Sequence, residues 1–221
     1  MPRPSFRSLA IFLVILPLAL LIWDASRLDD IALIFKEDHS IEVVSVVLLV
    51  LGVVLWFTLA GRHALREWQI PVLLTLMAAR ELDFDKRFTD AGLLKLRTYT
   101  GDAPMTTKLV GGAIILLVLV ASYRLLRRNL PFWWARLRGM HADALLILCA
   151  FLTGVLAKGL DGLARKLEPL GVAVPQNIDM FAGRAEEALE LLCYWMLCIA
   201  IARMTAVKYA AILHPKAIAA E

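Results

Sequence analysis

The sequence has few cysteines and histidines, and none of them forms a pattern typical of a disulfide framework or a catalytic centre. The three cysteines, Cys149, Cys193 and Cys198, lie inside apolar stretches without a Cys-x-x-Cys pair, so they are expected to be packing residues. The four histidines are scattered, and the sequence has no His-Glu-x-x-His, no Gly-x-Ser-x-Gly and no glycine-rich phosphate loop. These absences argue against a zinc protease, a haem-carrying four-helix core and a serine site of the rhomboid type.

Charged residues are also few compared with hydrophobic ones. Charged residues make up 20% of the 221 positions and hydrophobic residues 60%, against an average apolar share of about 45–50%. A water-soluble domain of this size could not bury so much apolar surface, which indicates a protein of the lipid bilayer. The 24 basic and 20 acidic side chains give a net charge of +4. Because the basic residues flank apolar runs, they are expected to contact lipid head groups rather than nucleic acid.

Long stretches without a formal charge recur six times, and none shows the strict alternation of a barrel strand. The sequence therefore predicts an all-α fold, a polytopic membrane protein built as one integral membrane domain with a bundle of about six transmembrane helices. The predicted spans are residues 8–24, 41–61, 68–87, 108–126, 143–163 and 184–204. The run Pro131-Phe-Trp-Trp134, followed by two arginines, predicts a separate interfacial helix at residues 130–139.

The distribution of arginine and lysine predicts the orientation of these spans. Basic loops stay on the cytoplasmic side, so both termini are expected in the cytoplasm and the acidic first loop outside. A plasma membrane is expected, most simply a bacterial inner membrane. The third loop, residues 81–108, carries many charges of both signs, and its side is left open.

Three apolar runs are too short to cross alone. Two have twelve residues, which cover only about 18 Å of the roughly 30 Å hydrocarbon layer, so flanking polar residues must enter it. Aligning the helices places these polar groups at one depth, in the outer half of the bilayer, with nothing comparable expected in the inner half. The candidate ligand-binding residues are Glu42, Arg80, Glu81, Lys158, Asp161, Glu187 and Glu190.

Acids outnumber bases among these groups, so some carboxyls are expected to be protonated or to hold a cation. Lys158 and Asp161 are three residues apart and are expected to pair along one helix. Glu190 belongs to both acidic stripes of the last predicted helix, with Glu186 and with Glu187, so it should face the bundle whichever stripe points inward.

Intramembrane ionisable residues are functional candidates, and three functions stay open. The first is binding or movement of a small cationic or zwitterionic solute, a proton or a lipid head group. The second is an enzyme that acts on lipid-linked substrates through paired carboxylates. The third is a structural subunit whose charges dock onto a partner in the membrane. No catalytic residue, metal ligand or cofactor can be assigned from the sequence. The expected partners are membrane lipids and, for the third function, a protein in the membrane; nucleic acid is not expected.

Overall fold

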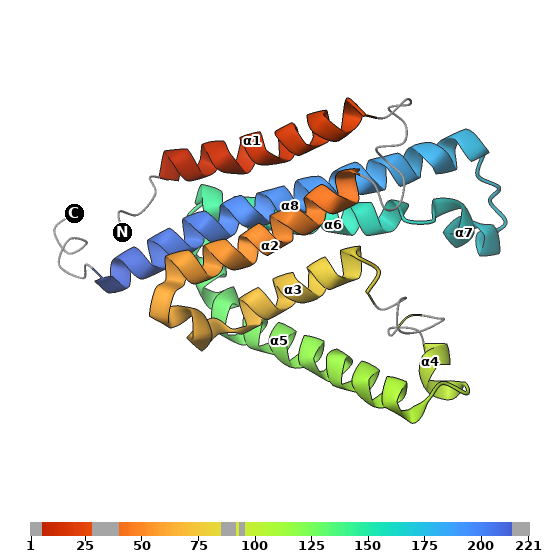
Figure 1. Cartoon of the computed structure of the whole chain (residues 1–221), viewed down its shortest axis with the longest axis horizontal. Helices are drawn as coiled ribbons and strands as arrows, with labels where there is room; N and C mark the ends of the chain where they lie inside the picture. Colours follow the sequence, from red (N-terminus) through yellow and green to blue (C-terminus); the bar gives the residue numbers. More distant parts are fainter. Residues whose placement is uncertain (1–5, 28–39, 85–91, 93–95, 214–221) are drawn as a thin grey trace.

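A computed structural model describes residues 6–27, 40–84, 92 and 96–213 of the chain (Figure 1). All regular elements in these ranges are helical, which confirms the predicted all-α fold. The α-helices are α1 (Phe6–Ala25), α2 (Ser40–Ala60), α3 (Gln69–Glu81), α4 (Leu96–Thr100), α5 (Met105–Arg138), α6 (Ala142–Leu160), α7 (Leu163–Leu167) and α8 (Gln176–Leu213). Two 3-10 helices, η2 (Gly61–Glu67) and η3 (Glu168–Leu170), connect them.

Within the described residues, four helices are long and apolar enough to cross a membrane. They comprise Ile41–Ala60, Met105–Arg138, Ala142–Leu160 and Gln176–Lys208. The predicted span 68–87 is corrected, because α3 ends at Glu81 after 13 residues, or roughly 20 Å of helix. The predicted span 8–24 lies within α1, a 20-residue helix that is not among these four. The structure thus supports a membrane bundle but not six full spans.

The separate interfacial helix predicted at residues 130–139 is also corrected. These residues form the last part of α5, which continues from the predicted span 108–126 as one helix of 34 residues. Pro131 lies inside it, where proline removes a backbone hydrogen bond and bends a helix. In Figure 1 the end of α5 rises behind α2 and α8.

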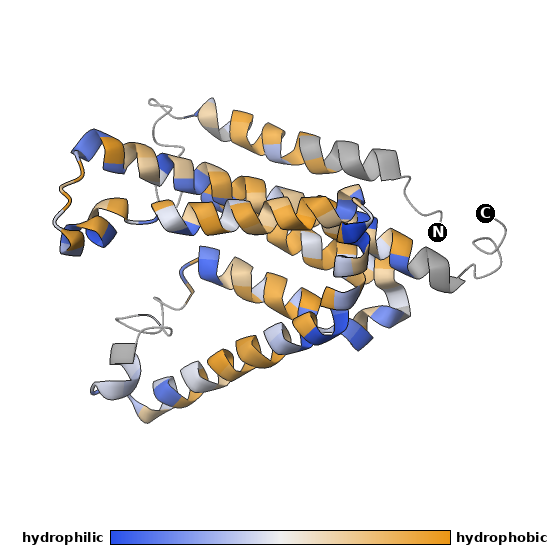
Figure 2. Cartoon of the chain, turned by 180° about the vertical axis from the view of Figure 1, so that it is seen from behind, coloured by the Kyte–Doolittle hydropathy of each residue, from blue (hydrophilic) through white to orange (hydrophobic). Residues whose placement is uncertain are grey.

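The core of the bundle lies between α2, α3, α6 and α8. Helix α8 packs most extensively against α6 and α2, and α3 lies against α2. Their interlocking side chains include Leu48, Leu49, Leu74 and Cys198, none more than 5% exposed. Away from this core, apolar residues are also frequent on α5 (Figure 2), where Leu116 and Leu119 are 63% and 61% exposed. An apolar exterior of this kind suits contact with lipid.

Helix α1 is joined to α8 by a hydrogen bond to a carbonyl that a proline of α1 leaves free. Pro17 has no N–H to donate to the carbonyl of Leu13, four residues earlier. The indole Nε1 of Trp195 on α8 donates to this carbonyl oxygen at 2.9 Å, and Leu13 is 1% exposed. Pro17 therefore leaves the Leu13 carbonyl free to accept the hydrogen bond that attaches α1 to α8.

Candidate functional site

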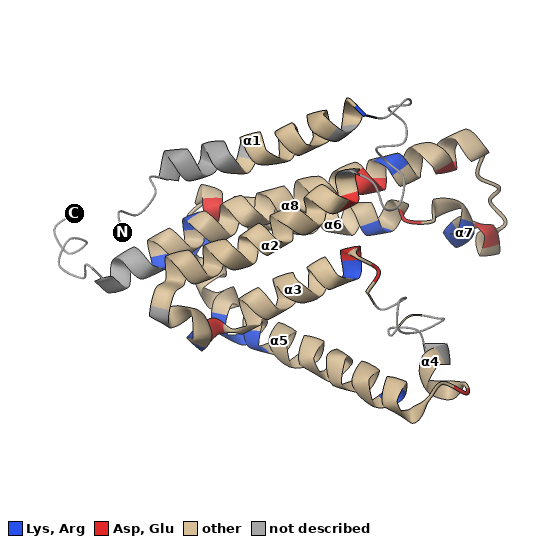
Figure 3. Ribbon diagram, viewed as in Figure 1, with Lys and Arg blue, Asp and Glu red and all other residues tan. Residues whose placement is uncertain are grey.

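Charged residues of four helices gather at one end of the bundle (Figure 3). The start of α2, the end of α3, the end of α6 and the first half of α8 all lie there. The residues they bring are Glu42 on α2, Arg80 and Glu81 on α3, Lys158 and Asp161 at the end of α6, and Glu186, Glu187 and Glu190 on α8. We call these eight residues the acidic cluster; it contains all seven candidates predicted from the sequence.

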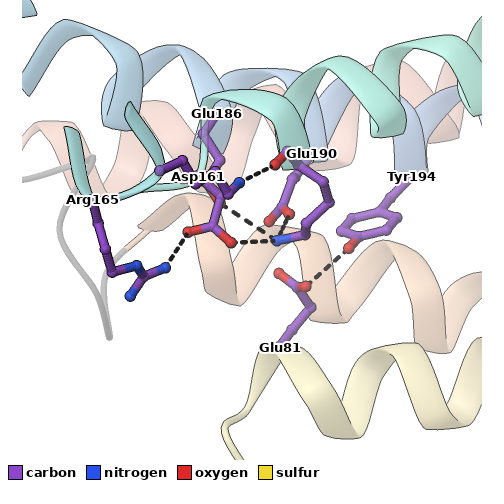
Figure 4. Close-up of polar contacts among 8 residues, drawn as sticks. Glu81, Asp161, Arg165, Glu186, Glu190 and Tyr194 are labelled. Atoms are coloured by element: carbon purple, nitrogen blue, oxygen red, sulfur yellow. Dashed lines mark hydrogen bonds and ion pairs between the residues drawn. The ribbon is translucent and has the colours of Figure 1, made fainter. Parts of the chain in front are cut away.

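Lys158 is the cation at the centre of the contacts in this cluster, and its three acidic partners, Asp161, Glu186 and Glu190, are labelled in Figure 4. Its Nζ lies 2.5 Å from Glu190 Oε1, 3.4 Å from Glu186 Oε1 and 3.9 Å from Asp161 Oδ2. Lys158 also stands in the last turn of α6, where a positive charge is favoured by the helix dipole. Its side chain is 48% exposed, so the cluster is open to the surroundings at this point.

Glu190 is the most buried of the acids in contact with Lys158. The residue is 8% exposed, which confirms that this position of α8 faces the bundle. Its Oε1 meets Lys158 at ion-pair distance but accepts no hydrogen bond of good geometry. A buried carboxylate oxygen without a hydrogen bond is costly, so the nearby ammonium group is its main compensation.

Glu81 is tied to the bundle interior rather than to its neighbour on α3. Its Oε1 accepts a hydrogen bond of 2.9 Å from the hydroxyl of Tyr194, a buried residue of α8 (Figure 4). The adjacent Arg80 is exposed, and its positive charge acts on both Glu81 and Lys158. The hydrogen bond therefore joins the short helix α3 to the longest helix of the bundle.

Glu187 is half-buried among other carboxylates. The acids close enough for their charges to repel its own are Glu42, Glu81, Glu186 and Glu190. The cluster contains six acids and two bases, and Arg165 next to Asp161 brings the bases to three, so the formal charge is 3 − 6 = −3. This excess favours a cation or bound protons.

The predicted pairing of Lys158 with Asp161 is only a minor contact. At 3.9 Å it is longer than the contacts to α8, and Asp161 lies equally far from Arg165. Asp161 instead caps α6 and precedes Gly162, whose φ of +57° is in the left-handed region that glycine adopts readily. This stop ends α6 at Leu160, before the predicted boundary at residue 163.

A second polar network lies at the opposite end of the bundle, where none was expected. Glu67 and Gln69 are 6% and 0% exposed. Lys208 Nζ lies 2.5 Å from Glu67 Oε1, and Asn129 Nδ2 donates to Glu67 Oε2 at 2.7 Å. Gln69 Nε2 donates to Asn129 Oδ1 at 2.9 Å, and Arg124 Nε donates to Gln69 Oε1 at 3.0 Å. This network, at the end of the bundle opposite the acidic cluster, was not predicted from the sequence.

Each group in this second network has a described partner, which indicates a structural role. Polar residues flanking Trp68 gave a weak signal in the sequence, but nothing local linked them to Asn129 or Lys208. Nearby, Arg136 Nε and Nη2 donate to Asp143 at 2.6 and 2.8 Å and close the turn between α5 and α6. The acidic cluster differs, because its negative charges exceed its positive ones.

In the described ranges, no three His, Cys, Asp or Glu side chains are arranged to hold a metal ion. The carboxylates gather around Lys158 and Tyr194 instead. No protein-family model, curated protein or solved structure matches this chain.

Proposed function

We propose that this protein binds a small cationic or zwitterionic species, or a proton, at the acidic cluster, and moves it across a membrane. The membrane in this proposal is the plasma membrane, a bacterial inner membrane, with both termini in the cytoplasm and the cluster in its outer half. The observation that carries the proposal is the gathering of six carboxyls from α2, α3, α6 and α8 against three bases.

The inward direction of these side chains supports binding over docking onto a partner. Glu190 and Glu186 have side chains 10% and 15% exposed, whereas charges that dock onto a neighbour in the membrane would face outwards. Lys158 is half-exposed and lies between the surroundings and these buried acids. A species with a positive charge can therefore replace the lysine as the partner of Glu190.

The interior side of the cluster is closed by apolar packing. Tyr194 is 7% exposed and belongs to the same packed core as Leu48, Leu74 and Cys198. This core separates the acidic cluster from the polar network around Glu67. We infer that this conformation binds its ligand from the side of Lys158, and that movement across the membrane needs a rearrangement of α3 or α8.

The test is ligand-induced thermal stabilisation of the purified full chain in neutral detergent. The probes are sodium, choline, ethanolamine and spermidine, followed by flux assays in proteoliposomes with a pH-sensitive dye. We expect at least one probe, or a pH gradient, to give a response in the wild type that Glu190→Gln abolishes. Glu186→Gln should have a smaller effect, because the Glu186 carboxylate lies 3.4 Å from Lys158 Nζ, against 2.5 Å for that of Glu190.

Glu168→Gln is the matched control, because it makes the same charge change on an exposed residue of η3. It should respond as the wild type does. The proposal fails if Glu190→Gln responds as the wild type does, or if its melting temperature without ligand shows that it no longer folds. It also fails if the control loses the response to the same extent.

A further inference from the structure

A cavity of about 440 Å³ opens between the start of α3 and the middle of α5, away from the acidic cluster. It is lined by Trp68, Val120, Tyr123, Arg124, Arg127 and Arg128. We propose that this cavity binds an anionic phospholipid, with its phosphate on the arginines and its acyl chain along the apolar face of α5.

The three arginines concentrate positive charge on one side of α5. Arg124, Arg127 and Arg128 are related by three and four residues, so their side chains lie on neighbouring turns of one helix face. In the part of the chain that the structure describes, no carboxylate lies within ion-pair distance of Arg127 or Arg128. Like charges at this spacing repel, and a bound anion removes that repulsion.

Arg124 is held in place as the inner wall of the cavity. Its Nε donates to Gln69 Oε1 at 3.0 Å, and its Nη2 donates to the carbonyl of Arg66 at 2.8 Å. Its guanidinium also lies 5.6 Å from the ring centre of Trp68. Arg127 and Arg128 are exposed beside it, and guanidinium groups match the geometry of phosphate oxygens well.

The apolar part of the lining favours a lipid over a soluble anion. Val120 is 45% exposed, and Leu116, one turn earlier, is 63% exposed, so a continuous apolar strip leads away from the arginines. Helix α5 has 34 residues, or about 51 Å, which exceeds the roughly 30 Å hydrocarbon layer. With the apolar turns in the hydrocarbon, the arginines reach head-group level, where phosphate and acyl chain meet.

The experiment is native mass spectrometry of the full chain in neutral detergent, titrated with dioleoylphosphatidylglycerol. Dioleoylphosphatidylcholine and inorganic phosphate serve as comparison ligands. We expect phosphatidylglycerol to bind more tightly than either, and the double variant Arg127→Gln with Arg128→Gln to weaken it about tenfold or more. Val120→Asn should also weaken binding of phosphatidylglycerol, because it places a polar group against the acyl chain.

The matched control is Arg138→Gln with Arg184→Gln, which removes two exposed arginines that lie outside the cavity. It should bind phosphatidylglycerol as the wild type does. The proposal is overturned if this control loses as much affinity as the double variant, because the affinity for phosphatidylglycerol would then depend only on the net charge of the protein. It is equally overturned if Arg127→Gln with Arg128→Gln binds normally, or if inorganic phosphate displaces the lipid and Val120→Asn has no effect. That last result would assign the cavity to a soluble anion.

Discussion

The hydrogen bond from Trp195 to the Leu13 carbonyl offers a direct test of how α1 is attached to the bundle. Replacement of Trp195 by Phe removes the indole N–H that donates to this oxygen at 2.9 Å. The carbonyl then has no donor, because Pro17 cannot supply the usual helix hydrogen bond. A buried acceptor left unpaired costs about 1–3 kcal/mol, so Trp195→Phe should lower the free energy of unfolding by at least that amount.

Pro17→Ala should reduce this cost. Alanine at position 17 has an N–H that can donate to the Leu13 carbonyl within α1. The carbonyl then no longer depends on Trp195 for a hydrogen bond. Trp195→Phe in the Pro17→Ala background then loses only ring packing, which is lost in both backgrounds and cancels in a double-mutant cycle. We expect a coupling energy of about 1–2 kcal/mol between the two positions.

The assay is equilibrium unfolding of the four variants in mixed micelles titrated with sodium dodecyl sulfate, followed by circular dichroism. Trp133→Phe is the control substitution, because its indole donates to the Ala144 carbonyl at 3.0 Å in a different part of the bundle. Its effect should add to that of Pro17→Ala to within about 0.5 kcal/mol. Equal costs of Trp195→Phe with and without Pro17 would refute the reasoning.

Two further predictions concern the acidic cluster and the topology. Lys158→Met should destabilise the protein in detergent by about 1–3 kcal/mol because it leaves Glu190 buried and unpaired, and adding Glu190→Gln should restore much of this loss. Adding Asp161→Asn instead should restore little, because that carboxylate is farther away and more exposed; equal rescue by both would contradict the geometry. In a cysteine-free background, single cysteines at Met140 and Gly171, on either side of α6, should be labelled from opposite sides of the membrane; labelling of both from one side would contradict a spanning α6.

Local sequence features were sufficient to predict the helices and much of the candidate site. Charge-free apolar runs identified α2, α6 and α8, because a helix in lipid must satisfy its own backbone and expose apolar side chains. Extending the short runs to membrane length placed Lys158 and Glu190 at one depth, and the structure brings them together. Residues 28–39 of the first loop, and residues 85–91 and 93–95 of the third loop, lie outside the described residues. The orientation of the chain in the membrane stays a prediction.

Helix continuity was less predictable where local signals conflicted. Pro131 and the adjacent tryptophans indicated a new helix, yet α5 runs through them to Arg138. A proline lacks only one donor, and packing of this segment against α6 can compensate for that loss. The opposite error occurred at α3, which stops at Glu81 although the sequence allowed a longer span.

The sequence by itself determined the all-α class, the apolar exterior and the charged residues that flank each apolar run. Only the tertiary structure decided which of them meet. Spacing along one helix indicated Lys158 with Asp161, whereas the fold pairs Lys158 with Glu190 on α8. In the same way, the second network joins Glu67 to Lys208 across 141 positions of the chain. The physical reason is that spacing fixes the face of a single helix, while contacts between helices depend on their rotation and axial offset, which packing of the whole bundle sets.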